Sequence, residues 1–278
     1  MSNYVKDKVI VITGAGSGFG RLVAEMTADM GAKVVGADIN EGGLREVVEG
    51  IRAKGQSAEH QVADVTEKAQ MDAVAALAVE KFGRIDVMLN NAGIMPLAYF
   101  ADHKDAWQAW DKSIDVNIKG VVNGITAVYD QMIEQGRGQV VNISSIYGNY
   151  GIPGSGVYSA TKAAVKVISD SLRAEAKGKI KVTTVKPTGI PGTNLGSAVV
   201  NDDALSGLVA HRQEEFAQNA EKYYSEQMPA EQLDPDSITY WTVTPEELAR
   251  NVVYAINQPW GVSISDITVR ASGEDYVY

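Results

Sequence analysis

Residues 9–20 read Val-Ile-Val-Ile-Thr-Gly-Ala-Gly-Ser-Gly-Phe-Gly, and this stretch decides the fold. Its β-branched run, 9–12, is apolar on both faces, which is typical of a strand inside a sheet that is covered on both sides. A glycine-rich turn follows at once, and a helix is expected from Arg21 to Gly31. Strand, turn and helix in this order predict a phosphate-binding loop, because a helix amino terminus offers unpaired amides and a positive dipole end.

The glycines of this loop have separate expected roles. Gly14 can make the sharp turn, whereas Gly18 and Gly20 lack the Cβ atom that would block a bound pyrophosphate or close helix packing. No Gly-Lys-Ser or Gly-Lys-Thr follows, so ATP and GTP are disfavoured. The alternative is a glycine-rich turn of no special role. The residues assigned to cofactor binding in this loop are Gly14, Ser17, Gly18, Phe19 and Gly20.

The chain beyond the loop continues to alternate strands and helices. Further strands are expected at 33–37, 58–63, 87–90, 139–144 and 181–186, with a seventh near 264–269. Further helices are expected at 43–55, 70–82, about 105–135, 157–177 and 245–258. This alternation implies right-handed crossovers. We therefore predict an α/β fold, a single domain over 1–278 with a doubly wound, parallel, seven-stranded sheet of the Rossmann-like kind.

One late region departs from this alternation. Residues 193–244 mix polar and acidic side chains with scattered leucine and aromatic residues. A long insertion late in a compact α/β domain is usually either a lid over the site or a surface decoration. Because the region starts close after the sixth strand, we predict a substrate lid at about 193–244.

Composition excludes several classes of function. The net charge of −10 repels phosphate backbones and anionic lipids, so neither nucleic acid nor a membrane is expected as a partner. The 278 residues include no cysteine and three widely separated histidines, so disulfides, thiolate zinc sites and cysteine nucleophiles are excluded and no metal is expected. The start holds no signal-peptide core and no apolar run reaches membrane-spanning length, so we expect a cytoplasmic protein.

Asp38 indicates the choice of cofactor. It ends the second expected strand, where a carboxylate can bond the adenosine ribose hydroxyls and would repel a 2′-phosphate. No lysine or arginine stands beside it or within the glycine loop. The pattern favours NAD over NADP, the alternative being an aspartate that merely caps the turn.

Tyr158 and Lys162 form a candidate acid–base pair, since residues four apart lie on one face of a helix. A free tyrosine has a pKa of about 10, and a pKa near 7 requires about 4 kcal/mol of stabilisation of the phenolate. One ammonium at about 4 Å supplies roughly that much at an effective dielectric near 20, and an oxidised nicotinamide ring adds a second positive charge. Such a pair is common on exposed helices, but Ser145, thirteen residues before Tyr158, and the glycine loop support a catalytic role.

Taken in order, the motifs resemble those of the short-chain dehydrogenases/reductases of the non-extended branch. The matching residues are Thr13-Gly14-x-x-x-Gly18-x-Gly20, Asp64-Val65, Asn90-Asn91-Ala92-Gly93, Asn117, Ser145 and Tyr158-x-x-x-Lys162. The match is strong over about residues 5–190 and weaker beyond them.

The resemblance implies a role for each matching residue. Asp64 and Val65 would contact the adenine, and Asn91 and Gly93 would flank the adenosine end of the cofactor. Tyr158 would exchange the proton and Ser145 would bond the substrate oxygen. Lys162 would hold the nicotinamide ribose and lower the pKa of Tyr158, while Asn117 would kink its helix and hold a water that relays protons to Lys162. By itself, Asn117 could equally be a polar residue inside a helix.

Two segments depart from the family pattern. After the sixth strand the run is Pro187-Thr188-Gly189-Ile190-Pro191-Gly192-Thr193, in which Pro187 and Ile190 can still face the cofactor but Thr193 is displaced by one position. After the seventh strand, Val269-Arg270-Ala271-Ser272 replaces a glycine-rich end and puts the family's tetramer in question. In this family the helix that bears Tyr158 and the long helix before it form a dimer face. We therefore expect a homo-oligomer, either dimer or tetramer.

These features predict an NAD-dependent alcohol dehydrogenase or ketone reductase. Residues after Ser145, namely Ile146, Tyr147, Tyr150 and Ile152, are expected to face the substrate together with Met95, although about half of them could pack into the protein instead. The apolar lining suggests a fairly bulky secondary alcohol or ketone as the small-molecule substrate. The alternatives are a non-enzymatic NAD(H)-binding sensor on the same fold, and an isomerase or dehydratase.

Overall fold

Seven parallel strands form one sheet in the computed structural model of the protein, which describes residues 2–191 and 193–276. In space the strands follow the order β3-β2-β1-β4-β5-β6-β7, so the α/β doubly wound fold is confirmed. The strands are β1 (Val9–Thr13), β2 (Lys33–Asp38), β3 (Ala58–Val62), β4 (Val87–Asn90), β5 (Gly138–Ile143), β6 (Ile180–Pro187) and β7 (Asp266–Val269).

The strand order reverses beside β1. The chain passes from β1 to β2 and β3 on one side, and then returns to place β4 on the other side of β1. Loops after β1 and β4 therefore separate at the carboxyl edge of the sheet and leave a crevice between them, which is where open α/β sheets bind ligands.

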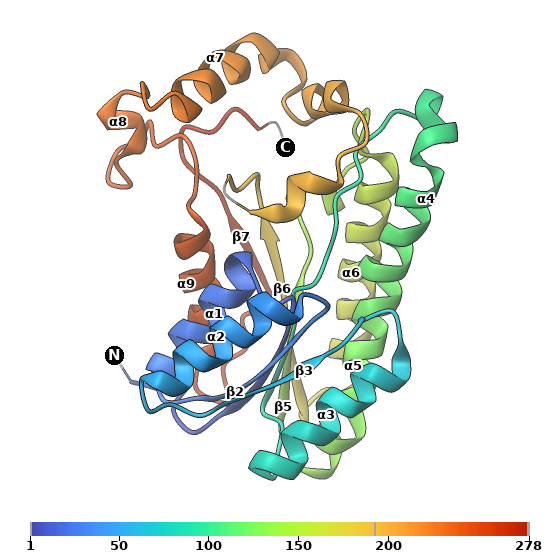
Figure 1. Cartoon of the computed structure of the whole chain (residues 1–278), viewed down its shortest axis with the longest axis vertical. Helices are drawn as coiled ribbons and strands as arrows, with labels where there is room; N and C mark the ends of the chain where they lie inside the picture. Colours follow the sequence, from blue (N-terminus) through green and yellow to red (C-terminus); the bar gives the residue numbers. More distant parts are fainter. Residues whose placement is uncertain (1, 192, 277–278) are drawn as a thin grey trace.

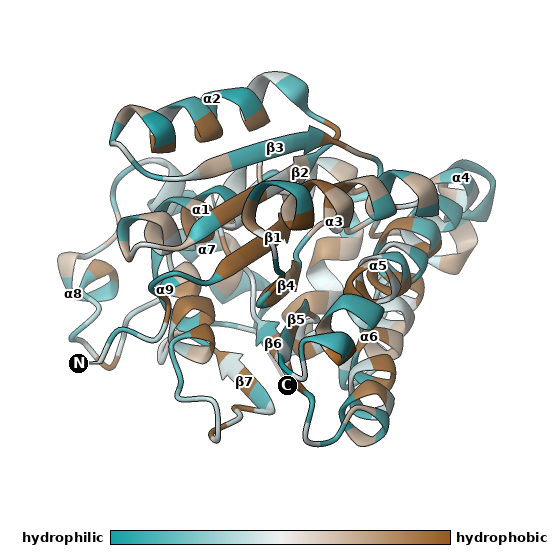
Figure 2. Ribbon diagram, turned by 90° about the horizontal axis from the view of Figure 1, so that it is seen from below, coloured by the Kyte–Doolittle hydropathy of each residue, from teal (hydrophilic) through white to brown (hydrophobic). Residues whose placement is uncertain are grey.

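Two layers of helices cover the sheet (Figures 1 and 2). Ile10 and Ile12 of β1 pack in the hydrophobic cluster formed with α1 (Gly18–Asp29), α2 (Glu41–Ala53) and α9 (Pro245–Ile256). Val9 and Val11 pack in the cluster of the opposite face, with α3 (Lys68–Phe82), α5 (Gly120–Glu134) and α6 (Gly156–Glu175). Successive side chains of a strand point to opposite faces, so the continuous apolar run of β1 follows directly from burial on both sides.

Two helices differ from the sequence expectation. α1 begins at Gly18 rather than Arg21, so the second half of the glycine-rich turn is already helical. The single helix expected over about 105–135 consists of α4 (His103–Ile114), a π-helical turn (Asp115–Lys119) and α5. Asn117 lies in this turn, and the extra residue of a π turn interrupts the 3.6-residue repeat that a single helix assumes.

The late region lies across the carboxyl end of the sheet. It contains short 3-10 turns at Asn194–Ala198, Asp202–Leu208 and Ala210–Arg212, followed by α7 (Gln213–Tyr224) and α8 (Ala230–Leu233). In Figure 1 the C-terminal segment after β7 runs beneath α7. None of the helices in the described part of the chain combines the length and apolar character needed to cross a bilayer.

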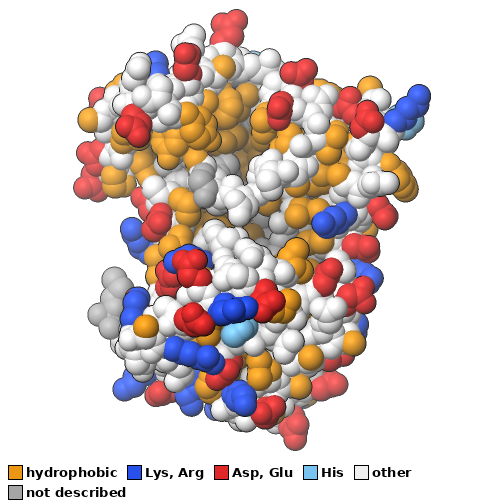
Figure 3. All heavy atoms as spheres, in the orientation of Figure 1, with side chains coloured by type: hydrophobic (Ala, Val, Ile, Leu, Met, Phe, Trp, Pro, Cys, Tyr) orange, Lys and Arg blue, Asp and Glu red, His pale blue; other side chains and the backbone are white. Residues whose placement is uncertain are grey.

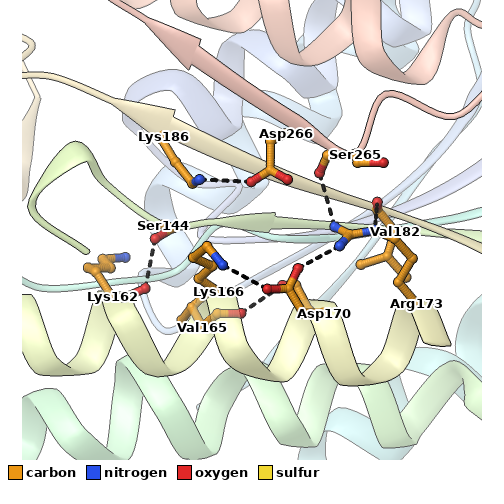
Figure 4. A network of polar contacts seen from close by, with 11 residues as sticks. Ser144, Lys162, Val165, Lys166, Asp170, Arg173, Val182, Lys186, Ser265 and Asp266 are labelled. Carbon is orange, nitrogen blue, oxygen red and sulfur yellow. Dashed lines mark hydrogen bonds and ion pairs between the residues drawn. The ribbon is translucent and has the colours of Figure 1, made fainter. Parts of the chain in front are cut away.

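A polar network fixes α6 against the edge of the sheet (Figure 4). Asp170 pairs with Lys166 at 2.8 Å and with Arg173 at 2.5 Å. Arg173 also donates to the carbonyl oxygens of Val182 and Ser265, so the helix is tied to β6 and to the residue before β7. Exposed ion pairs of this kind contribute little singly, but their geometry fixes the position of α6.

The contact between α5 and β4 gives a test of the packing. A Cβ atom at Gly124 would collide with Asn90 Oδ1 and lie 2.8 Å from Met88 Cε. We expect Gly124→Ala to lower the free energy of unfolding by about 1–3 kcal/mol, because an overpacked core must shift its neighbours. Urea denaturation measures the change.

The matched control is Gly50→Ala on the exposed face of α2, where a Cβ would meet nothing within 4 Å. This substitution should raise the free energy of unfolding by about 0.5–1 kcal/mol through helix propensity alone. Equal effects of the two substitutions would contradict the packing described for α5.

Candidate active site

A cavity of about 980 Å³ lies at the carboxyl edge of the sheet. The loops that follow the strands line one side of it, and the late region and C-terminal segment line the other. Figure 3 shows hydrophobic side chains gathered around a hollow on this face, below α7. The volume lies at the upper end of the range of about 300–1,000 Å³ that is common for ligand pockets, so the cavity has room for a large ligand such as a dinucleotide.

The glycine loop lines one end of this cavity. Gly14 has φ +65°, which a glycine adopts without strain. A Cβ atom at Gly20 would collide with the carbonyl oxygen of Gly14, so α1 packs directly on the turn. A Cβ at Gly18 would meet nothing within 4 Å, so this residue faces open space beside the helix amino terminus. All five predicted loop residues, Gly14, Ser17, Gly18, Phe19 and Gly20, line the cavity.

Asp38 lies at the same end. Its Oδ2 accepts a hydrogen bond from the Gly16 amide at 2.9 Å, and its Oδ1 accepts one from the Asn40 amide at 2.9 Å. These two bonds hold the carboxylate at the cavity wall. Among the described residues, the basic side chains that line the cavity are Lys112 and Lys162, which belong to α4 and α6.

The loop after β4 is tied to the glycine loop. Asn91 Nδ2 donates to the carbonyl oxygens of Thr13 and Gly14 at 2.9 and 3.1 Å. The remaining residues that sequence assigned to the cofactor also line the cavity, and they are Asp64, Val65, Asn91, Gly93, Pro187 and Ile190. Thr193 lines it as well, and its hydroxyl donates to the carbonyl oxygen of Ile190 at 3.1 Å.

Ser145, Tyr158 and Lys162 meet on the sheet side of the cavity. Ser145 follows β5, its Oγ accepts from the Tyr147 amide at 3.2 Å, and it lines the cavity together with Tyr158. Lys162 Nζ lies 5.8 Å from the centre of the Tyr158 ring and donates to the Ile143 carbonyl oxygen at 3.0 Å. Another bond, from Ser144 Oγ to the Lys162 carbonyl oxygen, appears in Figure 4 and joins α6 to the end of β5.

Burial moves the pKa values of the pair in opposite directions, each against its charged form. It lowers the pKa of Lys162 to about 8, because desolvation penalises the ammonium. It raises the pKa of Tyr158 to about 12, and the hydrogen bond from Ser145 opposes this only in part. The prediction that Lys162 and an oxidised nicotinamide ring together bring the pKa of Tyr158 near 7 concerns the protein with bound cofactor; among the protein's own groups, burial of the phenolate dominates.

Asn117 lies behind the cavity wall and is fully buried. Its Oδ1 accepts from the Ile94 amide at 2.9 Å, and its Nδ2 donates to the Ile94 carbonyl oxygen and to Thr161 Oγ1. A Cβ atom at Gly93 would lie 3.2 Å from Asn117 Oδ1 and 3.3 Å from Lys162 Nζ. The π turn thus brings Asn117 beside the lysine, where it connects the loop after β4 to α6.

The residues expected at the substrate end divide into two groups. Tyr147 and Met95 line the cavity as predicted. Ile146 and Ile152 pack inside a hydrophobic cluster, and Tyr150 is 56% exposed and does not line the cavity. The alternative that about half of this segment packs into the protein therefore holds for the two isoleucines.

The far wall of the cavity includes aromatic residues that no motif marks singly, three of them from the predicted lid. Phe216, Tyr224 and Trp241 come from the late region, and Tyr276 comes from the C-terminal segment. An aromatic residue on an amphipathic helix such as α7 can be expected to face inward, but nothing near Tyr276 in the sequence points to a cavity. Among the described residues, no three histidine or acidic side chains are grouped so that they could hold a metal ion.

Comparisons with known proteins agree with this geometry. Residues 8–204 match the family model described as short chain dehydrogenase. An uncharacterised oxidoreductase of Listeria innocua is 34% identical over 95% of this chain and 96% of its own length.

Among solved structures, the alcohol dehydrogenase of Thermococcus sibiricus complexed with 5-hydroxy-NADP superposes with a TM-score of 0.78 at 20% identity, covering 98% of this chain and all of the other. The closed form of a serine dehydrogenase complexed with NADP+ gives a TM-score of 0.75 at 27% identity and covers 94% of each chain. The chain has the same architecture as these solved structures. It is an oxidoreductase that belongs to the short-chain dehydrogenase family.

Proposed function

We propose that this protein transfers a hydride between NAD(H) and a fairly bulky, apolar secondary alcohol or ketone. One observation supports this most strongly. Ser145, Tyr158 and Lys162 lie together in a large cavity whose other end is the glycine loop. The open space at Gly18 and the carboxylate of Asp38 fit the pyrophosphate and the adenosine ribose of a dinucleotide.

The side chains divide the work between binding and proton transfer. Ser145 Oγ is placed to bond the substrate oxygen while Tyr158 takes the hydroxyl proton during oxidation or returns it during reduction. Bound NAD+ supplies the hydride acceptor and a second positive charge. Lys162, with a pKa of about 8, remains an ammonium at neutral pH and stabilises the phenolate.

The electrostatic balance can be estimated. Lowering the pKa of Tyr158 from about 12 to about 8 requires about 5 kcal/mol. Lys162 Nζ lies 5.8 Å from the centre of the Tyr158 ring, and one positive charge about 6 Å from a phenolate supplies about 3 kcal/mol at an effective dielectric near 20. Lys162 therefore provides about half of the stabilisation, and a second positive charge close to the phenol is needed for the rest.

The substrate class follows from the remaining walls. Met95, Tyr147, Leu205, Leu208 and Phe216 line the cavity opposite the glycine loop. These side chains are aliphatic or aromatic, and among the described residues no arginine lines the cavity to pair with a substrate carboxylate. Apolar ketones and secondary alcohols match this lining best.

We further propose that the chain self-associates through α5 and α6, in the cytoplasm. Val122 of α5 is 39% exposed and Val167 of α6 is 65% exposed, so both helices present apolar side chains to the surface. Exposed apolar groups on adjacent helices favour burial against a second copy.

Tyr158→Phe tests the acid–base assignment. The substitution keeps the ring but removes the proton, so we expect kcat for ketone reduction to fall by about 10²–10⁴-fold. NADH affinity, measured by fluorescence titration, should change little, since the loop and Asp38 are untouched. Tyr129→Phe on α5 is the control and should keep full activity; comparable activity in both variants would contradict the role of Tyr158.

Asp38 and Ile39 test the choice of cofactor. The wild-type protein should have a higher kcat/KM with NAD than with NADP, because the carboxylate repels a 2′-phosphate. Asp38→Ala combined with Ile39→Arg should shift the NADP/NAD ratio of kcat/KM by about 10²-fold, or about 3 kcal/mol. Ile39 is 67% exposed, so Ile39→Arg alone is the control and should shift the ratio much less. A wild-type preference for NADP would overturn the assignment.

A further inference from the structure

The C-terminal segment brings an aromatic side chain into the cavity. After β7 the chain turns back, and Tyr276 lines the cavity. Its ring centre lies 6.4 Å from that of Tyr147 in an edge-on arrangement and 5.7 Å from that of Phe216. It also packs on the hydrophobic cluster that contains Tyr158. Rings from the 3-10 turn after β5, from α7 and from the C-terminal segment thus line one chamber beside the proposed acid–base group.

Gly189 shows how closely the segment approaches the sheet. A Cβ atom at Gly189 would collide with the phenol of Tyr276. Gly189 lies between Pro187 and Ile190, two residues assigned to the cofactor side of the cavity. The phenol therefore occupies the junction between the cofactor end and the aromatic chamber.

A buried carboxylate holds this segment in place. Asp275 is 2% exposed, and its Oδ2 accepts hydrogen bonds from Trp241 Nε1 at 2.7 Å and from Asn219 Nδ2 at 3.0 Å. Asn219 belongs to α7, so the carboxylate joins the C-terminal segment to the late region. A buried charge is costly unless its partners remain in place, so these three residues, the Asp275 anchor, favour one arrangement of the segment.

The neighbouring residue strengthens this arrangement. The carboxylate of Glu274 pairs with Arg270 Nε at 2.6 Å and accepts from the Ala271 amide at 3.3 Å. Arg212, just before α7, donates to the Glu274 carbonyl oxygen at 3.4 Å. The backbone on the amino side of Tyr276 is therefore fixed at several points, and the ring is a rigid wall rather than a mobile terminus.

We propose that Tyr276 is a specificity-determining residue that restricts the chamber to substrates with a single aromatic ring, and that Asp275 is its positioning residue. The inference rests on the proposed function and names the substrate class, aryl-alkyl ketones and the corresponding secondary alcohols. Three surrounding rings offer edge-to-face contacts to one ring of a substrate. A second fused ring would overlap the phenol of Tyr276.

A pair of ketones tests whether Tyr276 limits the size of the substrate. Acetophenone carries one ring and 2-acetonaphthalene carries two, and the reacting group is the same in both. In Tyr276→Ala we expect the kcat/KM of the larger ketone relative to the smaller to rise by about 10-fold or more, mainly through KM, as for pockets that gain room. Tyr276→Phe keeps the ring and should restore the wild-type order. Tyr254→Ala, at a tyrosine of α9 that is 55% exposed, is the matched control.

Asp275→Asn tests the anchor. The amide keeps the size of the carboxylate and an oxygen that can accept both bonds, but it loses the charge that strengthens them. We expect the preference to shift in the direction of Tyr276→Ala, and amide hydrogen exchange to accelerate in both 213–224 and 270–276. A merely structural residue would lower the melting temperature without changing the ratio of the two ketones.

The outcomes separate this inference from the proposed function. If wild type, Tyr276→Ala and Asp275→Asn turn over both ketones with the same ratio of kcat/KM values, Tyr276 does not determine specificity. That result would leave the oxidoreductase assignment intact. NADH binding without turnover of either ketone by any variant would contradict the proposed substrate class and would overturn the inference with it.

Discussion

The chemistry of this site depends on one constraint, which is that a positive charge must be kept on a buried amine. Lys162 is 4% exposed. Within the described residues its ammonium donates one hydrogen bond, to the carbonyl oxygen of Ile143. The lowering of its pKa from 10.5 to about 8 corresponds to about 3 kcal/mol against the charged form. Two features of the structure leave space for the ammonium. Gly93 has no side chain beside Nζ, and Asn117, in the π turn, lies beside the same glycine.

The same burial determines the state of Tyr158. A phenol in an apolar chamber resists ionisation, so burial keeps Tyr158 neutral and the Ser145 side chain opposes only part of that cost. Such a pair becomes active when a further positive charge enters the cavity. Proton transfer would then be coupled to occupation of the cofactor end, while the aromatic chamber beside Tyr147 and Phe216 controls what reaches the phenol. Binding selectivity and acid–base strength thus arise from one desolvated space.

The sequence predicts the parts of this arrangement that depend on local pattern. The run before Gly14 indicates a strand buried on both faces, and the fold, the loop and the Tyr158–Lys162 pair follow from residue types at fixed spacing. The pKa of Tyr158 could not be obtained in this way, because it depends on desolvation by distant segments. Tyr150 does not line the cavity, and the sequence could not show which side chains after Ser145 do so, because that segment is an irregular turn without a periodic pattern. Tyr276 was missed because a buried carboxylate that pairs with the late region, rather than any local periodicity, brings it to the cavity.

The central claim is that Tyr158 becomes acidic only when Lys162 and bound NAD+ act together. Ultraviolet difference titration of the wild-type protein against Tyr158→Phe isolates the phenolate of this residue from the other tyrosines. Without nucleotide, we expect no Tyr158 phenolate below about pH 10; with saturating NAD+, it should form between about pH 7 and 9. An ionisation midpoint that NAD+ leaves unchanged would contradict the account.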